Sequence, residues 1–169
     1  MTRVGVVGAA GKMGKTLVAM IRESPDLDLA AAVDQPGQQA IGQDAGTVAN
    51  VGETGVFIAD DLAQVVADID VLIDFTIAVA TEKSMEICHS AGTRMVIGTT
   101  GLSESQIVRL DEISSSVPVV FASNYSIGVN ATFQLVEMAA GIFGDTVDVE
   151  IIESHHRHKV DAPSGTAIS

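Results

Sequence analysis

The sequence predicts an α/β protein in which helices cover both faces of a parallel β-sheet. Short runs rich in Val and Ile alternate with longer segments of helical period, and these runs are apolar throughout rather than at every second position. Strands of that kind are buried on both faces, and the helices between them supply the cover. Hydrophobic residues make up 47% of the 169 residues and aromatic residues 4%, so we expect a sizeable core of Val, Ile, Leu and Ala.

Strands and helices are expected to alternate along residues 1–126. The apolar runs predicted to form strands are residues 4–7, 27–33, 71–74, 95–97 and 117–122. The segments predicted to form helices are residues 13–23, 61–66, 78–91 and 103–115. Ser103 is a residue type that caps helix N-termini, and Leu17, Met20 and Ile21 share one face of the first helix. Residues 35–55 are rich in Gly, Gln and Ala and are predicted to be irregular or only partly helical.

The pattern changes after Tyr125. A long apolar helix is expected over residues 129–143, closed by Gly144, and a strand over residues 147–152. We therefore predict a boundary near residues 126–128, with a doubly wound domain over residues 1–126 and a second, smaller unit over residues 127–169. The second unit is expected to be the beginning of an α+β domain and to be incomplete, because a predicted helix starts just before Ser169.

The charge balance limits the partners that the chain can have. Lys and Arg number 9 against 22 Asp and Glu, a formal net charge of −13. Nucleic-acid binding depends on Lys and Arg at phosphates, and anionic membrane surfaces repel an acidic protein, so neither partner is expected. Cys88 is the one cysteine, which fits a reducing compartment, and the first residues lack the apolar core of a signal peptide. No uncharged apolar run approaches the ~20 residues of a membrane helix, so we expect a soluble cytoplasmic protein.

A glycine-rich turn joins the first predicted strand to the first predicted helix. It reads Gly8-Ala-Ala-Gly11-Lys-Met-Gly14. Glycines let the backbone approach a pyrophosphate closely, and a helix N-terminus directs N–H groups and partial positive charge at it. Asp34 ends the next strand, 20 residues after Gly14, where an acid hydrogen-bonds the ribose hydroxyls of a dinucleotide. A glycine triplet alone also suits a tight strand–helix turn, but together these features favour a Rossmann-like dinucleotide site.

Two residues bear on the choice between NADH and NADPH. Asp34 repels a 2′-phosphate and so favours NADH. Lys12, on the first turn of the predicted helix, either pairs with that phosphate or is an ordinary solvated lysine. We predict that NADH is the preferred cofactor and that NADPH is tolerated.

Two further loops follow predicted strands, at residues 98–101 (Gly-Thr-Thr-Gly) and 122–126 (Ala-Ser-Asn-Tyr-Ser). Ligands of open parallel sheets bind outside the carboxyl ends of the strands, so these loops are placed to contact the nicotinamide ring and its ribose. Gly, Thr, Ser and Asn are also common turn residues, and without the first glycine loop ordinary turn chemistry would explain them.

Three histidines, an arginine and a lysine occupy residues 155–159 of this acidic chain. A metal site is not favoured, because neighbouring imidazoles do not easily face one ion and no cysteine cluster completes a tetrahedron. A nucleophile at Ser164 is not favoured either, because the flanking sequence lacks the G-x-S-x-G turn. An acid/base and anion site is preferred: histidine titrates near neutral pH, lysine adds positive charge, and a helix start after Pro163 offers amides for a carboxylate. The alternative is a solvated basic loop.

The segment Glu153-x-His-His-x-x-Lys159-x-Asp-x-Pro-Ser-Gly-Thr-Ala167 resembles the signature of the 4-hydroxy-tetrahydrodipicolinate reductase (dihydrodipicolinate reductase) family. The motifs that are also similar to that family are the glycine loop, Asp74-Phe-Thr76, Val96-Ile-Gly-Thr-Thr-Gly101 and Asn124-Tyr-Ser-x-Gly-Val-Asn130. The resemblance runs from Val4 to the last residue. It implies an oxidoreductase that reduces 4-hydroxy-tetrahydrodipicolinate to tetrahydrodipicolinate by hydride transfer from NAD(P)H, in the diaminopimelate route to lysine.

The resemblance also implies roles for matching residues. His155 would be the general acid that protonates the substrate, and Lys159 would stabilise or deliver that proton. His156, Gly165 and Thr166 would bind the substrate carboxylates, with Ser164 at the predicted helix start. The residues implied to line the nicotinamide dinucleotide are Gly8, Ala9, Ala10, Gly11, Lys12, Met13, Asp34, Gly98, Thr99, Thr100, Ala122, Ser123, Asn124 and Tyr125.

The chain also departs from the family pattern. Some members have Glu-Arg where this chain has Asp34-Gln35, and the missing cation again favours NADH. The family's substrate domain continues further and builds a tetramer, so a homotetramer is expected where that part is present, and the pocket is expected to be incomplete without it. Two alternatives stay open: a non-catalytic dinucleotide-binding module, and a related dehydrogenase for another small imino or amino acid, which would leave the His-His-x-x-Lys segment unexplained.

Overall fold

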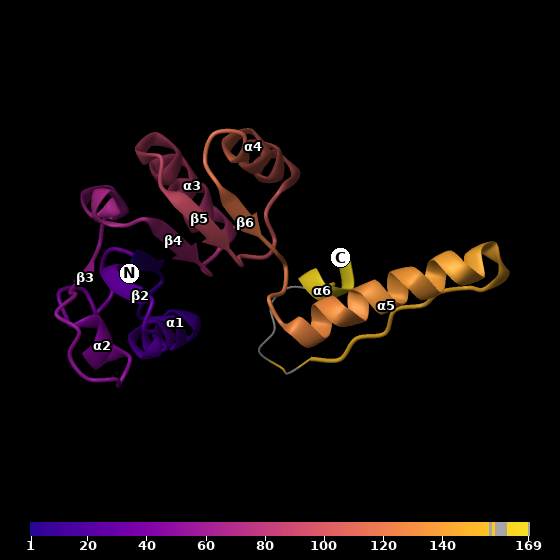
Figure 1. Ribbon diagram of the computed structural model, residues 1–169, viewed down its shortest axis with the longest axis horizontal. Coiled ribbons are helices and arrows are strands. Elements are labelled where there is room, and N and C mark those ends of the chain that lie inside the picture. Colours follow the sequence, from indigo (N-terminus) through magenta and orange to yellow (C-terminus); the bar gives the residue numbers. More distant parts are fainter. Residues whose placement is uncertain (156, 158–161, 169) are drawn as a thin grey trace. The chain divides into compact units, whose positions relative to one another are not determined.

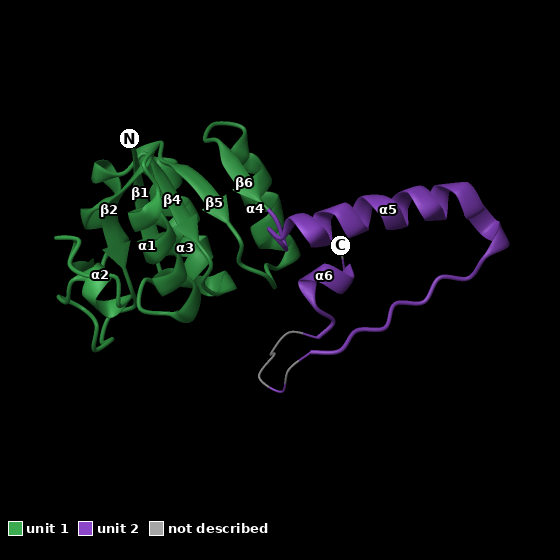
Figure 2. Cartoon of the chain, turned by 60° about the horizontal axis from the view of Figure 1, so that its bottom comes forward, with its two compact units in different colours: residues 1–121 green, residues 122–169 purple. Residues whose placement is uncertain are grey.

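The computed structural model of the protein describes residues 1–155, 157 and 162–168. The chain forms two compact units, Met1–Phe121 and Ala122–Ser169 (Figure 2). The first unit holds the glycine loop, and the second holds the described part of the histidine-rich segment. The domain boundaries predicted from the sequence, 1–126 and 127–169, stay predictions, because a compact unit is not by itself an independently folding domain.

The first unit is built around a six-stranded sheet whose strands all pair in parallel, in the order β3-β2-β1-β4-β5-β6 (Figure 1). The strands are β1 (Thr2–Val7), β2 (Leu27–Val33), β3 (Ile58–Ala59), β4 (Val71–Asp74), β5 (Arg94–Ile97) and β6 (Val119–Phe121). The order reverses at β1, because β2 and β3 lie on one side of it and β4, β5 and β6 on the other. The predicted doubly wound α/β fold is therefore confirmed, and its ligand crevice falls at the carboxyl ends of β1 and β4.

Helices cover both faces of this sheet and bury a separate cluster on each. The helices of the first unit are α1 (Lys12–Glu23), α2 (Ala45–Val48), α3 (Ala78–Ala91) and α4 (Glu104–Ser114), with 3-10 helices η1 (Leu62–Gln64) and η2 (Val66–Asp68). On one face Val18 of α1 packs in a cluster with Val6 of β1. On the other, Met85 of α3 and Ile113 of α4 pack in a cluster with Leu72 of β4. All five side chains are fully buried, as continuous apolar strands require.

Ser103 caps α4 as predicted. Its hydroxyl accepts the N–H of Gln106, and the Gln106 side chain accepts the N–H of Ser103 in return, which makes a capping box. The N–H groups of Ser103 and Gln106, which have no partner within the helix, are both satisfied in this way. α4 is thereby fixed at the end that follows the loop of residues 98–101.

Two predicted elements differ from the structure. Where one α-helix was predicted over residues 61–66, the chain forms two short 3-10 helices, Leu62–Gln64 and Val66–Asp68. Asp61 accepts the N–H of Ala63 at the start of the first, and Val65 between them leaves the helical backbone conformation. Residues 147–152 do not form a strand, and Val149 and Ile152 are exposed. A strand needs a neighbour for its N–H and C=O groups, and no described segment pairs with residues 147–152.

The second unit contains α5 (Ile127–Phe143), a 3-10 turn η3 (Gly144–Thr146) and α6 (Gly165–Ile168). Ser126 caps α5 and Gly144 ends it, close to the predicted limits. None of the side chains of α5 is buried. Within the described part of the chain, one stretch, Ile127–Thr146, is long and apolar enough to cross a membrane by length and composition alone, which is a weak indication.

Candidate functional site

The glycine loop bends tightly between β1 and α1. Gly8 adopts φ +68°, and its carbonyl accepts the N–H of Gly11 at 2.9 Å. A Cβ on Gly14 would lie 2.1 Å from the Gly8 carbonyl oxygen, so α1 approaches the loop more closely than any other residue allows. The N-cap of α1, Gly11, makes no side-chain hydrogen bond to the helix, and the first turn carries no acid. The start of α1 therefore suits an anion.

Asp34 connects the end of β2 to this loop. Its carboxylate accepts the N–H of Ala10 at 2.8 Å through Oδ2 and the N–H of Gln35 at 2.8 Å through Oδ1. The N–H of Ala9 donates to the Val33 carbonyl at 3.1 Å. Asp34 thus fixes the loop against β2, at the position where a dinucleotide-binding acid meets the ribose.

A cavity of about 600 Å³ opens at the carboxyl ends of the strands. Its lining includes Gly8 after β1, Asp34 after β2, Asp60 and Asp61 after β3, and Lys83 of α3. A cavity of this size, beside a glycine loop and a ribose-binding acid, fits the adenosine half of a dinucleotide. Three carboxylates against one amine make its lining acidic. The predicted site residues Gly8 and Asp34 are therefore brought together at one cavity.

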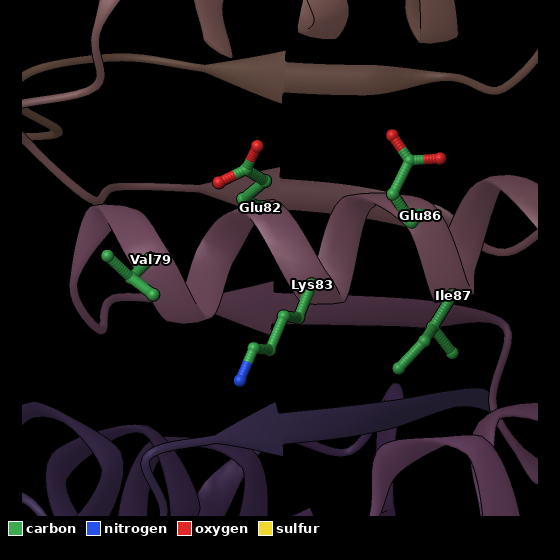
Figure 3. Close-up of a pocket in the computed structure, with 5 residues that line it drawn as sticks. All are labelled: Val79, Glu82, Lys83, Glu86 and Ile87. Carbon is green, nitrogen blue, oxygen red and sulfur yellow. The ribbon is translucent and has the colours of Figure 1, made fainter.

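A second hollow, of about 530 Å³, is lined only by α3 residues. Figure 3 shows its Glu82 and Glu86 on one side of α3 and its Lys83 and Ile87 on another. Glu86 forms ion pairs with Arg109 of α4, at 2.7 and 2.9 Å. This hollow lacks any residue of the glycine loop, so the first cavity is the candidate cofactor site.

The loop after β5 presents one of its two threonines outward. Thr99 is 2% exposed, and its hydroxyl accepts from Thr81 at 2.8 Å and donates to Asp74 at 3.3 Å. Thr100 is exposed. A Cβ on Gly98 would lie 2.1 Å from the Phe75 ring, so the loop packs directly on the segment that follows β4. Backbone groups of this loop and the Thr100 side chain are therefore the parts available to a ligand.

In the second unit, the predicted cofactor loop and the predicted substrate segment meet at Asn124. The Asn124 side chain donates to the Thr166 hydroxyl at 3.2 Å and accepts the N–H of Ser126 at 2.8 Å. Asn130 of α5 donates to the Asn124 carbonyl at 3.0 Å. Partial burial raises the pKa of the Tyr125 hydroxyl, so it is a neutral donor at neutral pH. Residues distant in sequence are thus held at one place within this unit.

Glu153 organises the described part of the histidine-rich segment. Its carboxylate accepts the N–H of Ser164 at 2.9 Å and also the Ser164 hydroxyl, and Ser164 is 2% exposed. His155 Nδ1 lies 3.5 Å from Glu153 Oε2, so the carboxylate can pair with a protonated ring. Sequence reasoning gave Glu153 no role, although an acid two residues before a candidate catalytic histidine is a usable signal. His156 and Lys159 lie outside the described residues.

The described residues include no group of three His, Cys, Asp or Glu side chains that could hold a metal ion. The first unit, with its reversing parallel sheet, glycine loop, acid after β2 and cavity, has a Rossmann-like fold, and this fold defines the class of the protein.

The sequence matches the dihydrodipicolinate reductase N-terminal family over residues 2–125 and the C-terminal family over residues 128–169. The chain therefore belongs to the dihydrodipicolinate reductase family. It is 52% identical over 166 residues to the 4-hydroxy-tetrahydrodipicolinate reductase of Acinetobacter baumannii, covering 98% of this chain and 60% of that protein. It is 52% identical over 168 residues to that of Alkalilimnicola ehrlichii, covering 99% and 63%. The suspected resemblance is confirmed.

A solved structure gives the same result at the level of the fold. The dipicolinate-bound dihydrodipicolinate reductase from Paenisporosarcina sp. TG-14 superposes with a TM-score of 0.76 at 29% identity, covering 99% of this chain and 63% of that one. The chain thus spans about 60% of the length of the relatives that it matches.

Proposed function

We propose that this protein is a 4-hydroxy-tetrahydrodipicolinate reductase, which reduces its cyclic substrate to tetrahydrodipicolinate in lysine and diaminopimelate biosynthesis. The observation that carries the proposal is the glycine loop held by Asp34 beside a cavity of dinucleotide size. When bound there, a reduced nicotinamide cofactor supplies the hydride. The relatives named as this reductase support the choice of reaction. We place the protein in the cytoplasm and expect a homotetramer.

The second unit supplies the proton and the substrate contacts in this proposal. His155 is the general acid, and Glu153, whose Oε2 lies 3.5 Å from the His155 Nδ1, orients the ring. Lys159 stabilises or delivers the proton. His156, Gly165 and Thr166 hold the substrate carboxylates. The Ser164 amide and hydroxyl already bind Glu153, so we assign Ser164 to the same site as the residue that fixes Glu153 and the start of α6.

The acidic lining of the cavity supports NADH as the preferred cofactor, with NADPH tolerated. A 2′-phosphate beside the ribose would enter a cavity lined by Asp34, Asp60 and Asp61, and like charges repel. Lys83 lines the same cavity and Lys12 starts α1, and these are the amines that would accommodate the phosphate. Titration of the protein with each cofactor, by nucleotide fluorescence, checks the preference. Equal or tighter NADPH binding would overturn it.

Oxidation of NADH, followed by absorbance with the cyclic substrate as acceptor, tests the reaction. We expect His155→Ala to lower kcat by about 10²-fold or more, the usual contribution of a general acid. Lys159→Ala is expected to lower it as well. His89→Ala removes a histidine of α3 in the first unit and is the matched control, which should retain turnover. NADH binding without turnover in the parent chain would instead identify a non-catalytic binding module.

A further inference from the structure

Asp74 is a buried carboxylate to which the proposed reaction gives no role. It ends β4, is 1% exposed, and lies between β1 and β5, pairing with Val7 and Ile97. Its Oδ1 accepts the N–H of Thr76 at 2.9 Å, the hydroxyl of Thr76 at 2.6 Å and the hydroxyl of Thr99 at 3.3 Å. Its Oδ2 has no hydrogen-bond partner among the described residues.

The segment that Asp74 begins separates two loops of the cofactor site. A Cβ on Gly8 would lie 2.8 Å from Thr76 Cγ2, and a Cβ on Gly98 would lie 2.1 Å from the Phe75 ring. The glycine loop and the loop after β5 therefore both pack on residues 74–76. The Oδ1 of Asp74 accepts from Thr99, in the loop after β5, and from Thr76, the residue against which Gly8 of the glycine loop packs.

We propose that Asp74 is a positioning residue for the nicotinamide half of the cofactor. It acts through Thr99, whose hydroxyl it holds inward, so that the backbone of residues 98–100 and the Thr100 side chain face the crevice. In a doubly wound sheet the two halves of a dinucleotide bind on opposite sides of the point where the strand order reverses. Asp34, directly after β2, marks the adenosine side, and Asp74 lies on the β4–β5 side. The proposal rests on the dinucleotide binding proposed above.

The chemistry of Asp74 argues against a purely structural role. A carboxylate taken out of water is costly, and the cost is largest when one oxygen has no donor. An apolar residue at the end of β4 would avoid that cost. Thr81 extends the network, since its hydroxyl donates to Thr99 at 2.8 Å and fixes which way the Thr99 hydroxyl points. The group is thus better suited to orienting the loop than to stabilising the core.

Binding of two probes, NADH and ADP, tests the proposal by calorimetry with the 169-residue chain. ADP contains the adenosine and the pyrophosphate and lacks the nicotinamide ring and its ribose. We expect Asp74→Ala and Thr99→Val to weaken NADH binding about tenfold, or 1.4 kcal/mol, and to change ADP binding less than about twofold. Asp74→Asn keeps the acceptor Oδ1, and Thr99→Ser keeps the hydroxyl, so both should restore most of the NADH affinity.

Thr93→Val is the matched control, because Thr93 is a buried threonine that precedes β5 at the opposite end from Thr99. It should lower the melting temperature as much as Thr99→Val does and leave both probes unaffected. Equal loss of NADH and ADP affinity, or folded Asp74→Ala and Thr99→Val proteins with parent NADH affinity, would overturn the role of Asp74. If Asp74→Ala does not fold, Thr99→Val decides. A parent chain that binds neither probe refutes the proposed function itself.

Discussion

Gly14→Ala is the change that most directly tests how the glycine loop works. The added methyl would stand 2.1 Å from the Gly8 carbonyl oxygen and 2.7 Å from Ala9 Cα, both backbone atoms that no rotamer change can move. Restoring ordinary contact at 3.4 Å requires α1 and the loop to separate by more than 1 Å. Alanine gains about 1 kcal/mol of helix propensity over glycine, but overpacking costs about 1–3 kcal/mol, so we expect a net loss of up to about 2 kcal/mol.

The larger effect should be on NADH, because the N–H groups at the start of α1 retreat from the pyrophosphate. We expect at least about a tenfold rise in Kd, measured by nucleotide fluorescence, and a fall in melting temperature of a few degrees. Gly141→Ala is the matched control, since Gly141 also lies inside a helix and its Cβ would meet nothing within 4 Å. That control should be stabilised slightly. A Gly14→Ala protein with parent Tm and parent Kd would refute the steric reasoning.

Three further predictions concern the first unit. Burial raises the pKa of the Cys88 thiol to about 12, so a thiol reagent at pH 8 should label the native chain only as fast as it unfolds; immediate labelling would contradict this. Hydrogen bonds from Arg3 lower the pKa of Asp70 from 3.8 to about 2, so Asp70→Asn should reduce the urea midpoint above pH 3.8, and the difference should vanish as pH falls through about 2. Met85→Ala should cost about 2–5 kcal/mol in urea unfolding, whereas exposed Met20→Ala should cost almost nothing.

Elements with a strong internal pattern were predictable from the sequence. The strand over residues 27–33 and the helix over residues 78–91 have the predicted limits, because apolar runs and helical periodicity are local properties. The strand expected over residues 147–152 was wrong, because pairing depends on a partner elsewhere in the chain. The two-residue strand β3 was missed for the same reason, since it exists only through its pairing with Ala32 and Val33.

The candidate site was likewise predictable only in part: its local motifs could be found in the sequence, and its contacts between distant residues could not. The glycine loop and Asp34 carry local signals, namely residue type and distance along the chain. The hydrogen bond from Ala10 to Asp34 spans 24 residues, and that from Ser164 to Glu153 spans 11, and neither contact follows from a pattern in the sequence. The sequence indicates Asp74 only as the end of a strand and as part of a motif, because the role proposed for it depends on Thr99, which follows β5 and lies 25 residues away along the chain.

The hydrogen bond between Asp34 and Ala10 has a consequence for redesign of cofactor choice. In the proposed site, the acid that would discriminate against a 2′-phosphate is also the acceptor that holds the glycine loop through the Ala10 N–H. Exchanging Asp34 for a cationic residue would therefore change selectivity and release the loop at the same time, so that affinity for both nucleotides falls. A variant whose cofactor preference is changed to NADPH would therefore need a second substitution that supplies a new acceptor for the Ala10 N–H. In the proposed site, cofactor selectivity and the order of the glycine loop would therefore both depend on the Asp34 carboxylate.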